Sequence, residues 1–135
     1  MGVKWQFVHK LKKQSLVEDF ETKNHVTLPS DLKECIKKNN AGLPDKNVFD
    51  TEKSVERVFN SLFSYNPGDL DNIYDVFPFF SKMKPPLIPF ASDPFGNTLC
   101  VLNDNIVLYL HETGDIEAVA DSFSDLLEKL YIPEE

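Results

Sequence analysis

The chain has 135 residues, a net charge of −8 at pH 7 and an isoelectric point near 4.8. Its length suits one domain with its own hydrophobic core, so we expect a single domain over residues 1–135. Hydrophobic residues make up 41% and charged residues 27%, as in soluble globular proteins. No apolar run approaches the ~20 residues that span a bilayer, and the N-terminus lacks the apolar core of a secretory signal. We therefore expect a cytoplasmic protein without a membrane segment.

The charge is unevenly distributed along the chain. Residues 1–40 carry eight lysines and five acidic residues, whereas residues 41–135 carry six basic and seventeen acidic residues. In residues 104–135, nine acids are balanced only by Lys129. Such a field repels the phosphates of nucleic acids and anionic lipids, so we expect no direct binding to nucleic acid or to a membrane. It favours a basic protein partner, although solubility alone also explains an acidic surface.

Cysteine and histidine are sparse. Cys35 falls on the apolar side of a predicted helix and Cys100 within a predicted strand, so both are expected to be buried free thiols. The three histidines, His9, His25 and His111, lack the paired spacing of zinc ligands. We expect no metal ion and no cofactor.

Two helical patterns occur in the first forty residues. Apolar residues recur at helical spacing over 3–22, with a break expected near Ser15. A second helix is predicted for residues 30–38. Ser30 is its expected N-cap, and the asparagines and glycine of residues 39–42 end it.

Residues 43–66 show no clear periodicity. A short strand is predicted at 47–50. Residues 56–64 fit either a helix or a strand, and we favour a strand because β-branched and aromatic residues concentrate there.

A third helix is predicted after the turn at residues 66–69. Asp69 is its expected N-cap, its apolar face begins at Leu70 and continues to Phe77, and Pro78 ends it. The residues after Pro78 are expected to form a loop.

The most regular part of the sequence is a meander of short apolar runs. Strands are predicted at 87–91, 98–102 and 106–110, separated by turns rich in Asp, Asn, Pro and Gly. A shorter strand at 116–119 and a helix over 122–130 follow, the helix opening with a capping box at Ser122 and Asp125. The fold class expected from this order is α+β.

No residue pattern predicts a catalytic site. The turn at 93–97 has oxygen ligands and a glycine but lacks the ligand spacing of a calcium loop. His111 and Glu112 are adjacent, without a nearby nucleophile in an activating motif. Asp71 and Asp75 would lie side by side on the predicted helix without a histidine, which favours a solvated face over a metal site.

A binding function directs attention to exposed acids and to aromatic rings in loops. Phe79 and Phe80 follow a proline in an expected loop, where an exposed ring beside acids resembles an interface anchor. Packing of that loop onto the sheet is an equally good interpretation. The candidate partner-binding residues are Asp69, Asp71, Asp75, Phe79, Phe80, Glu112, Asp115 and Glu117.

The order of four motifs resembles the SUKH superfamily of Smi–Knr-type domains. The resemblance covers residues 16–130 and departs from the family at Ala41-Gly42, where a double glycine is usual. The motifs are Asp19-Phe20-Glu21 before Leu28-Pro29, the helix-closing Asn39-Asn40-Ala41-Gly42, Ile88-Pro89-Phe90-Ala91-Ser92-Asp93 with Gly96-Asn97, and Ala120-Asp121-Ser122-Phe123.

The resemblance implies a central, mostly antiparallel sheet with helices packed around it. It also implies a non-catalytic protein-binding module, in particular an immunity protein that neutralises a toxin by direct binding, as a monomer or weak dimer. The alternatives are a scaffold or cell-wall regulator and, on the acidic residues alone, a small metal-dependent hydrolase, which would need a buried carboxyl group of raised pKa.

Overall fold

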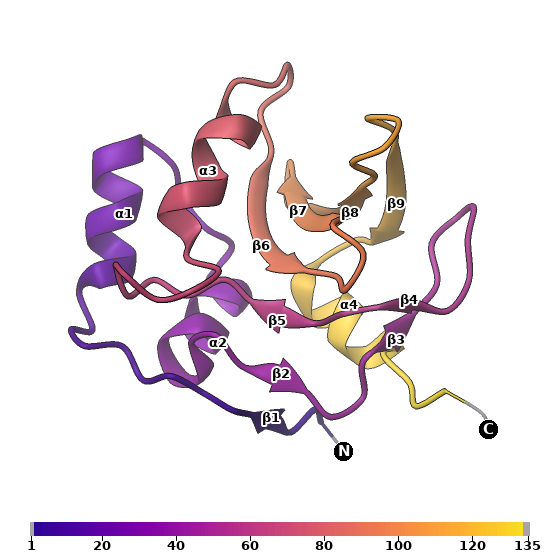
Figure 1. The fold of residues 1–135 in the computed structure, drawn as a ribbon, viewed down its shortest axis with the longest axis horizontal. Coiled ribbons are helices and arrows are strands. Elements are labelled where there is room, and N and C mark those ends of the chain that lie inside the picture. The colour runs from indigo at the N-terminus through magenta and orange to yellow at the C-terminus, as the bar shows by residue number, and fades with distance from the viewer. Residues whose placement is uncertain (1, 134–135) are drawn as a thin grey trace.

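A computed structural model of the chain describes residues 2–133, and its elements are labelled in Figure 1. Within these residues no helix has the length and apolar character to cross a membrane. In chain order the elements are β1 (Trp5–Gln6), α1 (Leu16–Asn24), α2 (Ser30–Asn39), β2 (Leu43–Pro44), β3 (Val48–Phe49), β4 (Arg57–Val58), β5 (Ser61–Leu62), α3 (Ile73–Ser81), β6 (Ile88–Ser92), β7 (Thr98–Leu102), β8 (Asn105–Tyr109), β9 (Ile116–Ala120) and α4 (Phe123–Lys129).

The largest sheet is antiparallel and has five strands in the order β5-β6-β7-β8-β9. Leu102 pairs with Asn105, which leaves Asn103 and Asp104 as a two-residue hairpin loop with φ values of 50° and 70°. Asn and Asp tolerate this left-handed conformation, which a tight hairpin needs. The predicted meander and the α+β class are confirmed.

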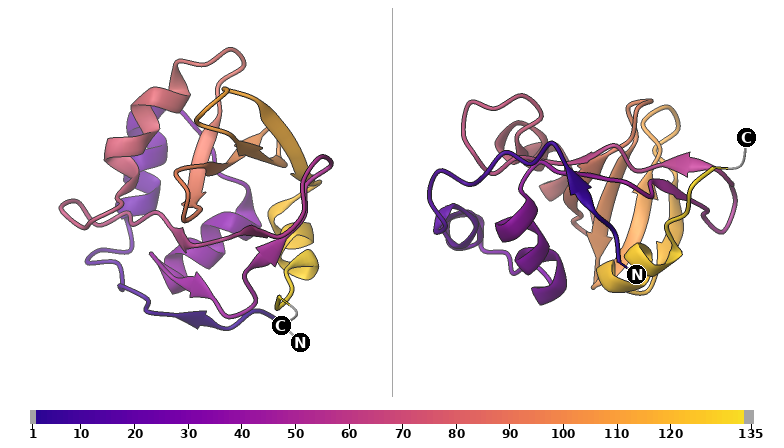
Figure 2. Two further views of the ribbon diagram at one scale, coloured as in Figure 1. Left: turned by 45° about the vertical axis from the view of Figure 1, so that its right-hand side comes forward. Right: turned by 90° about the horizontal axis from the view of Figure 1, so that it is seen from below.

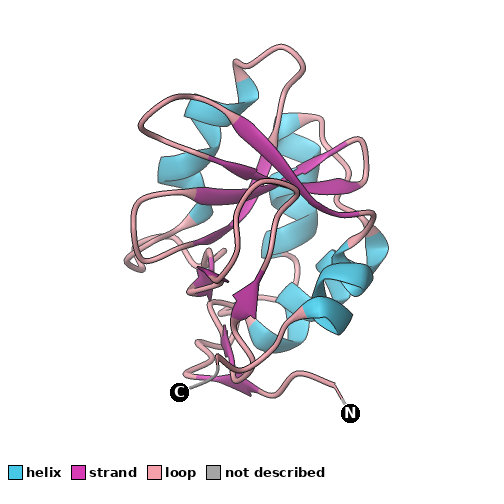
Figure 3. Cartoon of the chain, turned by 90° about the vertical axis from the view of Figure 1, so that its right-hand side faces the viewer, coloured by secondary structure: helices cyan, strands magenta, loops and turns pink. Residues whose placement is uncertain are grey.

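Side chains alternate along each strand, so residues of one strand pack against two different apolar clusters, one on each face of the sheet. Leu99 and Val101 of β7 join the main core with residues of α1, α2 and α4. Cys100 and Val107 point the other way and pack with Phe80 of α3. Figure 3 shows the strands at the centre of the molecule with helices on more than one side.

The helices occupy different sides of the sheet. Figure 1 shows α1 next to α3, and the rings of Phe20 and Phe77 join them edge to face at 4.9 Å. The view from below in Figure 2 shows α4 against the strands. α4 also contacts α2, because Oδ2 of Asp31 accepts the N–H and the hydroxyl of Ser124 at 2.9 and 2.8 Å. The predicted arrangement of helices around a central antiparallel sheet is therefore confirmed.

The predicted caps hold for one helix and fail for another. The Ser122 hydroxyl accepts the N–H of Asp125 at 3.0 Å, as the capping box predicts for α4. In α2, Pro29 is the N-cap and Ser30 is already helical, without a side-chain cap bond. Pro fits this boundary because its fixed φ suits the entry to a helix.

The helix predicted over residues 3–14 is wrong. β1 pairs with β2, and the chain then follows an irregular path to Ser15, after which α1 begins. The N–H of His9 donates to the carbonyl of Asn40 at 2.9 Å, and that of Lys12 donates to Oδ1 of Asn66 at 2.8 Å. These long-range bonds satisfy backbone groups that a helix would otherwise pair, so tertiary contacts override the local spacing.

The single strand predicted over residues 56–64 is two short strands in different sheets. β4 pairs with β3, whereas β5 pairs with β6. Phe59 stands between them, fully buried, and its N–H donates to the carbonyl of Asn47 at 2.7 Å. The residues therefore form strands, as their β-propensity predicts, but two separate strands with the buried Phe59 between them.

The third helix starts later than predicted and continues through its proline. Asn72, not Asp69, is the N-cap of α3, and its Oδ1 accepts the N–H of Asp75 at 2.9 Å. Leu70 is 92% exposed instead of buried. Pro78 lies inside the helix, which runs to Ser81, so the Phe residues that follow it are helical and not in a loop.

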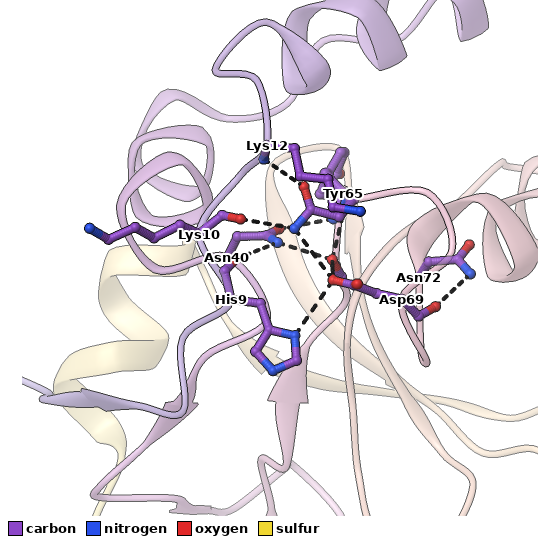
Figure 4. A network of polar contacts seen from close by, with 9 residues as sticks. His9, Lys10, Lys12, Asn40, Tyr65, Asp69 and Asn72 are labelled. Atoms are coloured by element: carbon purple, nitrogen blue, oxygen red, sulfur yellow. Dashed lines mark hydrogen bonds and ion pairs between the residues drawn. The ribbon is translucent and has the colours of Figure 1, made fainter.

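A buried asparagine joins the N-terminal segment to the centre of the chain (Figure 4). Asn40 is 1% exposed, and its Nδ2 donates to the carbonyl of His9 at 2.9 Å and to Oγ of Ser64 at 3.0 Å. Its Oδ1 accepts the N–H of Tyr65 at 2.9 Å. All the polar atoms of this amide side chain are therefore occupied, as burial requires.

Asn66 and Asp69 extend the same network. Asn66 Nδ2 donates to the carbonyl of Lys10 at 2.9 Å, while the Ser64 hydroxyl donates to Asp69 Oδ2 at 2.7 Å. The hydrogen bond from Ser64 first, and then those from Asn66 and His9, hold the pKa of Asp69 below its ordinary range. Through Asn40 the network holds the segment that follows α2.

A loop also covers the outer edge of β9. The N–H of Glu52 donates to the carbonyl of Ala118 at 3.0 Å, and the N–H of Ala118 donates to Oε1 of Glu52 at 3.1 Å. The carboxylate of Glu117, 7% exposed, accepts the hydroxyls of Ser54 and Thr51, each at 2.6 Å. These hydrogen bonds hold the pKa of Glu117 below its ordinary range.

Replacing the buried amide tests the network. Asn40→Ala leaves the Tyr65 N–H, the His9 carbonyl and the Ser64 hydroxyl without this partner, so we expect a loss of about 2–3 kcal/mol in the free energy of unfolding. Urea unfolding followed by circular dichroism measures it. The neighbouring Asn39→Ala is the control and should cost much less; equal losses for the two variants would contradict the network's role.

Glu117→Gln tests the second network through its dependence on pH. We expect the variant to be about 1 kcal/mol less stable near neutral pH, because hydrogen bonds to a charged group are stronger. Since the folded pKa is depressed, this advantage exists above the ordinary pKa of about 4.3 and disappears as the pH falls through the folded value. Urea unfolding at about pH 7 and about pH 3 should show the difference shrinking. A difference of the same size at both pH values, or the same trend in the exposed Glu128→Gln, would refute the assignment.

Candidate functional site

Exposed acids and aromatic rings meet where the outer side of α3 approaches two turns of the sheet. The turns are residues 93–97, between β6 and β7, and residues 110–115, between β8 and β9. They lie at the same end of the sheet because Thr98 pairs with Tyr109, and Tyr109 pairs with Ile116. We call this region the turn-end surface; its exposed residues include Asp75, Phe79, Phe95, His111, Glu112 and Asp115.

Two adjoining hollows mark this surface, and both are lined by His111. One has a volume of ≈ 280 Å³ and lies between α3, with Asp75 and Phe79, and the strand ends at Thr98 and Tyr109. The other has a volume of ≈ 210 Å³ and is lined by Phe95, Glu112 and Arg57, among others. The shared histidine shows that α3 and both turns form one continuous surface.

A buried aspartate holds the β6–β7 turn in shape. Asp93 is 5% exposed, and its Oδ1 accepts the N–H groups of Phe95 and Asn97, each at 2.8 Å. Its Oδ2 accepts Nδ2 of Asn97, also at 2.8 Å. A carboxylate with these partners is satisfied although it is buried, and it fixes the turn that presents Phe95 to solvent.

The same turn is joined to the β8–β9 turn. Oδ1 of Asn97 accepts the N–H of His111 at 3.1 Å. Gly96 has φ of +91°, and a Cβ at that position would stand 3.1 Å from the ring of His111. Glycine is required here both by the backbone conformation and by the close approach of the imidazole.

Three aromatic rings stand between α3 and β8. Phe79 and Phe80 lie 5.0 Å apart, and Tyr109 lies 5.8 Å from Phe79 and 5.2 Å from Phe80, all edge to face. Phe80 is 4% exposed, whereas Phe79 keeps 56% of its surface exposed. The buried ring of Phe80 and the half-buried ring of Tyr109 therefore restrict the exposed ring of Phe79, which lowers the entropy that it loses on binding.

Four of the eight candidate residues lie on the turn-end surface with exposed side chains. Asp75 and Phe79 come from α3, and Glu112 and Asp115 come from the β8–β9 turn. They are about forty residues apart in sequence, and the packing of α3 against Tyr109 at the end of β8 brings them to one surface.

The other acidic candidates stand differently. Asp69 belongs to the polar network of Asn40 and Ser64. Asp71 is exposed but precedes α3 with φ of 56°, so it does not lie beside Asp75 at helical spacing. That pairing, predicted from a helix starting at 69, is wrong because Asn72 caps the helix instead.

Two candidates are buried. Phe80 belongs to the smaller apolar cluster with Leu87, Cys100 and Val107, because α3 continues past Pro78. Glu117 is 7% exposed and accepts hydroxyl groups from the loop that covers β9. Neither side chain is available to a partner in this structure, although Phe80 contributes to the wall of the ≈ 280 Å³ hollow.

The binding candidates chosen by sequence do not include Phe95, Tyr109 or His111, although His111 lines both hollows of this surface. Phe95 is 69% exposed, and Tyr109 carries part of the aromatic contact. A signal for Phe95 existed, because an aromatic residue between Pro94 and Gly96 in a tight turn has no strand or helix face to bury it. Tyr109 gave no such signal, since its place in a strand predicts an ordinary packing role.

The pKa values of carboxyl groups and of thiols shift in opposite directions. Among residues 2–133, each carboxyl group with a resolved shift has a lowered pKa, for example Glu18 at about 2 beside Lys37. Burial raises the pKa of Cys35 to about 11 and that of Cys100 further, so both thiols stay protonated near neutral pH. Over the same residues no group of three or more His, Cys, Asp and Glu side chains is arranged to hold a metal ion.

A larger groove of ≈ 660 Å³ lies at another part of the molecule. It is lined by the C-terminal end of α1, including His25, by Phe77 of α3, and by the tight loop of Asn103 and Asp104. None of the candidate residues lines it. We therefore regard the turn-end surface as the candidate functional site.

Gly96→Ala tests the contact between the two turns against a matched control. The two glycines have nearly equal φ values, +92° at Gly68 and +91° at Gly96. A Cβ added at Gly68 would have no atom within 4 Å, whereas one added at Gly96 would lie 3.1 Å from the imidazole of His111. Both alanine variants should lose about 1–2 kcal/mol from backbone strain. Only Gly96→Ala should shift the His111 resonances in a ¹H–¹³C spectrum. Unchanged His111 signals, or equal changes in both variants, would contradict the proposed contact.

Comparison with known proteins gives one result. A family model described as SMI1-KNR4 cell-wall, named SUKH_6, matches residues 14–127. No curated protein and no solved structure matches the chain. The matched range includes α1 to α3, the whole five-stranded sheet and most of α4, so the family accounts for the fold and for the elements that build the turn-end surface. The chain belongs to the SUKH superfamily of SMI1–KNR4-type domains.

Proposed function

We propose that this protein is a non-catalytic binding module that acts as one domain in the cytoplasm and neutralises a toxin by direct binding. Membership of the SUKH superfamily is compatible with an immunity role and with a role of the Smi1/Knr4 type. The observation that carries the proposal is the exposed ring of Phe79, held by Phe80 and Tyr109 beside acidic side chains. Aromatic anchors with fixed positions are typical of the energetic centre of protein interfaces.

Charge indicates the kind of partner. The net charge is −8. Asp75 lines the same hollow as the Phe79 anchor, and Glu112 and Asp115 are exposed in the β8–β9 turn. Such a surface attracts a basic protein over the distance of a Debye length and repels nucleic acid and anionic membranes. A basic toxin domain satisfies this requirement.

The mechanism is stoichiometric blocking of the toxin. Phe79, with Phe95 nearby, would lose water on binding and provide most of the affinity, while the exposed acids would raise the association rate. A monomer is sufficient for this mechanism. In this mechanism no bond is made or broken.

A protection experiment tests the function. The chain should be co-expressed with the toxin encoded by the adjacent gene, and growth of the host should be restored. Purified chain should bind that toxin in a one-to-one complex by calorimetry, more weakly as the salt concentration rises. Absence of both binding and protection for every adjacent toxin would overturn the immunity proposal.

Two phenylalanine variants test the surface. Phe79→Ala should weaken toxin binding by about 2 kcal/mol, or roughly thirtyfold, because it removes the aromatic anchor. Phe7→Ala is the matched control, since Phe7 is more exposed, at 76%, but follows β1 in the N-terminal segment. It should bind like the wild type. A loss of affinity in Phe7→Ala without one in Phe79→Ala would place the interface elsewhere.

The alternative within the family is a scaffold or regulator of the cell-wall type. It would use the same kind of surface, so geometry alone does not separate the two roles. A scaffold predicts stable complexes with several host proteins in the absence of any toxin, which affinity purification from the native host measures. The metal-dependent hydrolase has no supporting observation among residues 2–133.

A further inference from the structure

We propose that the ≈ 280 Å³ hollow between α3 and the β7–β8 strands receives an arginine side chain of the protein partner. This inference rests on the proposed function as a binding module, and it names the partner group that the surface recognises. The hollow is smaller than the roughly 300–1,000 Å³ of typical small-molecule sites, so it suits one side chain of a larger ligand.

Aromatic groups form a large part of the wall of this hollow. Phe79, Phe80 and Tyr109 all line it, and their mutual edge-to-face contacts at 5.0 to 5.8 Å keep the rings in place. Phe79 remains 56% exposed, so part of its ring is open to a ligand. The negative face of an aromatic ring attracts a cation, and arginine stacks on such a face more readily than lysine does.

A carboxylate stands at the same hollow without a cationic partner. Asp75 is exposed, and Oδ2 accepts one hydrogen bond, from Nδ2 of Asn72 at 2.9 Å, which helps to orient it. Within the part of the chain that the structure describes, no lysine, arginine or histidine forms an ion pair with Asp75. Arg57, the single arginine of the sequence, lines the neighbouring hollow and donates to Ser54 instead.

Polar groups on the opposite wall complete the fit. Thr98, Gly96 and His111 line the hollow on the side of the sheet. The backbone of His111 is held by the bond from its N–H to Asn97, and its imidazole lies close to Gly96. A guanidinium group between the Phe79 ring and the Asp75 carboxylate would combine stacking with a charge-assisted hydrogen bond, a combination that a lysine ammonium group provides less well.

A titration with short peptides tests the hollow without any toxin. The probes are acetyl-Gly-Arg-Gly-amide, the same peptide with citrulline, which is neutral but nearly the same shape, and the same peptide with lysine. ¹H–¹⁵N spectra of the whole chain should show saturable shifts of the Val76, Gly96, Thr98 and His111 amides with the arginine peptide. The citrulline and lysine peptides should bind about five- to tenfold more weakly.

Variants make the test specific. Asp75→Asn removes the carboxylate charge, and Phe79→Leu removes the aromatic face but keeps an apolar side chain; each should weaken the arginine peptide about fivefold or more. Asp121→Asn changes the net charge equally at an exposed position outside the hollow and should bind like the wild type. Wild-type-like spectra of the free variants show that they are folded.

The outcomes separate this inference from the proposed function. Selective binding of the arginine peptide at the hollow supports the inference, whether or not a toxin is neutralised. Shifts at other residues, or equal binding of the citrulline peptide, overturn it. Equal or tighter binding of the lysine peptide overturns the assignment to arginine. Toxin neutralisation that survives both Asp75→Asn and Phe79→Leu would leave the function standing and remove the hollow from it.

Discussion

The buried carboxylate of Asp93 is the constraint on which the functional surface depends. It accepts two backbone N–H groups and one side-chain amide within a single turn, and that amide, Asn97, in turn accepts the N–H of His111. One side chain thus holds the shape of the β6–β7 turn. Asn97 then joins this turn to the β8–β9 turn, which strand pairing places at the same end of the sheet. Because loops on a rigid scaffold are where binding residues concentrate, this clamp explains how short turns keep exposed groups in position.

A second polar network performs the same task at another place. It consists of Asn40, Ser64 and Asn66 (Figure 4). These residues connect the N-terminal segment to the chain before α3, although the two segments are far apart in sequence. Both networks have their polar atoms satisfied, so the cost of burying them is offset. They also allow short strands and irregular segments to keep one conformation. The result is a stable frame that leaves an exposed aromatic ring and unpaired carboxylates at the surface.

The sequence was most informative where local and tertiary preferences agree. The strands of the meander, the tight turns between them and the capping box of α4 follow from alternation and turn chemistry, and the structure confirms them. The sequence was misleading where a distant contact decides. Apolar residues recur at helical spacing over residues 3–14, yet backbone N–H groups of this segment donate to Asn40 and Asn66. Likewise, Asn72 and not Asp69 is the N-cap of α3. At the site, the sequence predicts the exposed acids of the β8–β9 turn. It predicts the aromatic groups only in part, because α3 continues past Pro78, which buries Phe80 and leaves Phe79 exposed. Phe95 and Tyr109 join the surface only through strand pairing.

We propose that a basic protein partner binds at the turn-end surface. Hydrogen exchange of the chain, alone and in complex with the toxin of the adjacent gene, tests it most directly, because exchange reports which backbone amides a partner covers or stabilises. We predict slower exchange in the complex at residues 75–80, 94–98 and 109–115, with little change elsewhere. Protection confined to the groove formed by residues 23–27 and 101–104, or to the N-terminal segment, would contradict the claim.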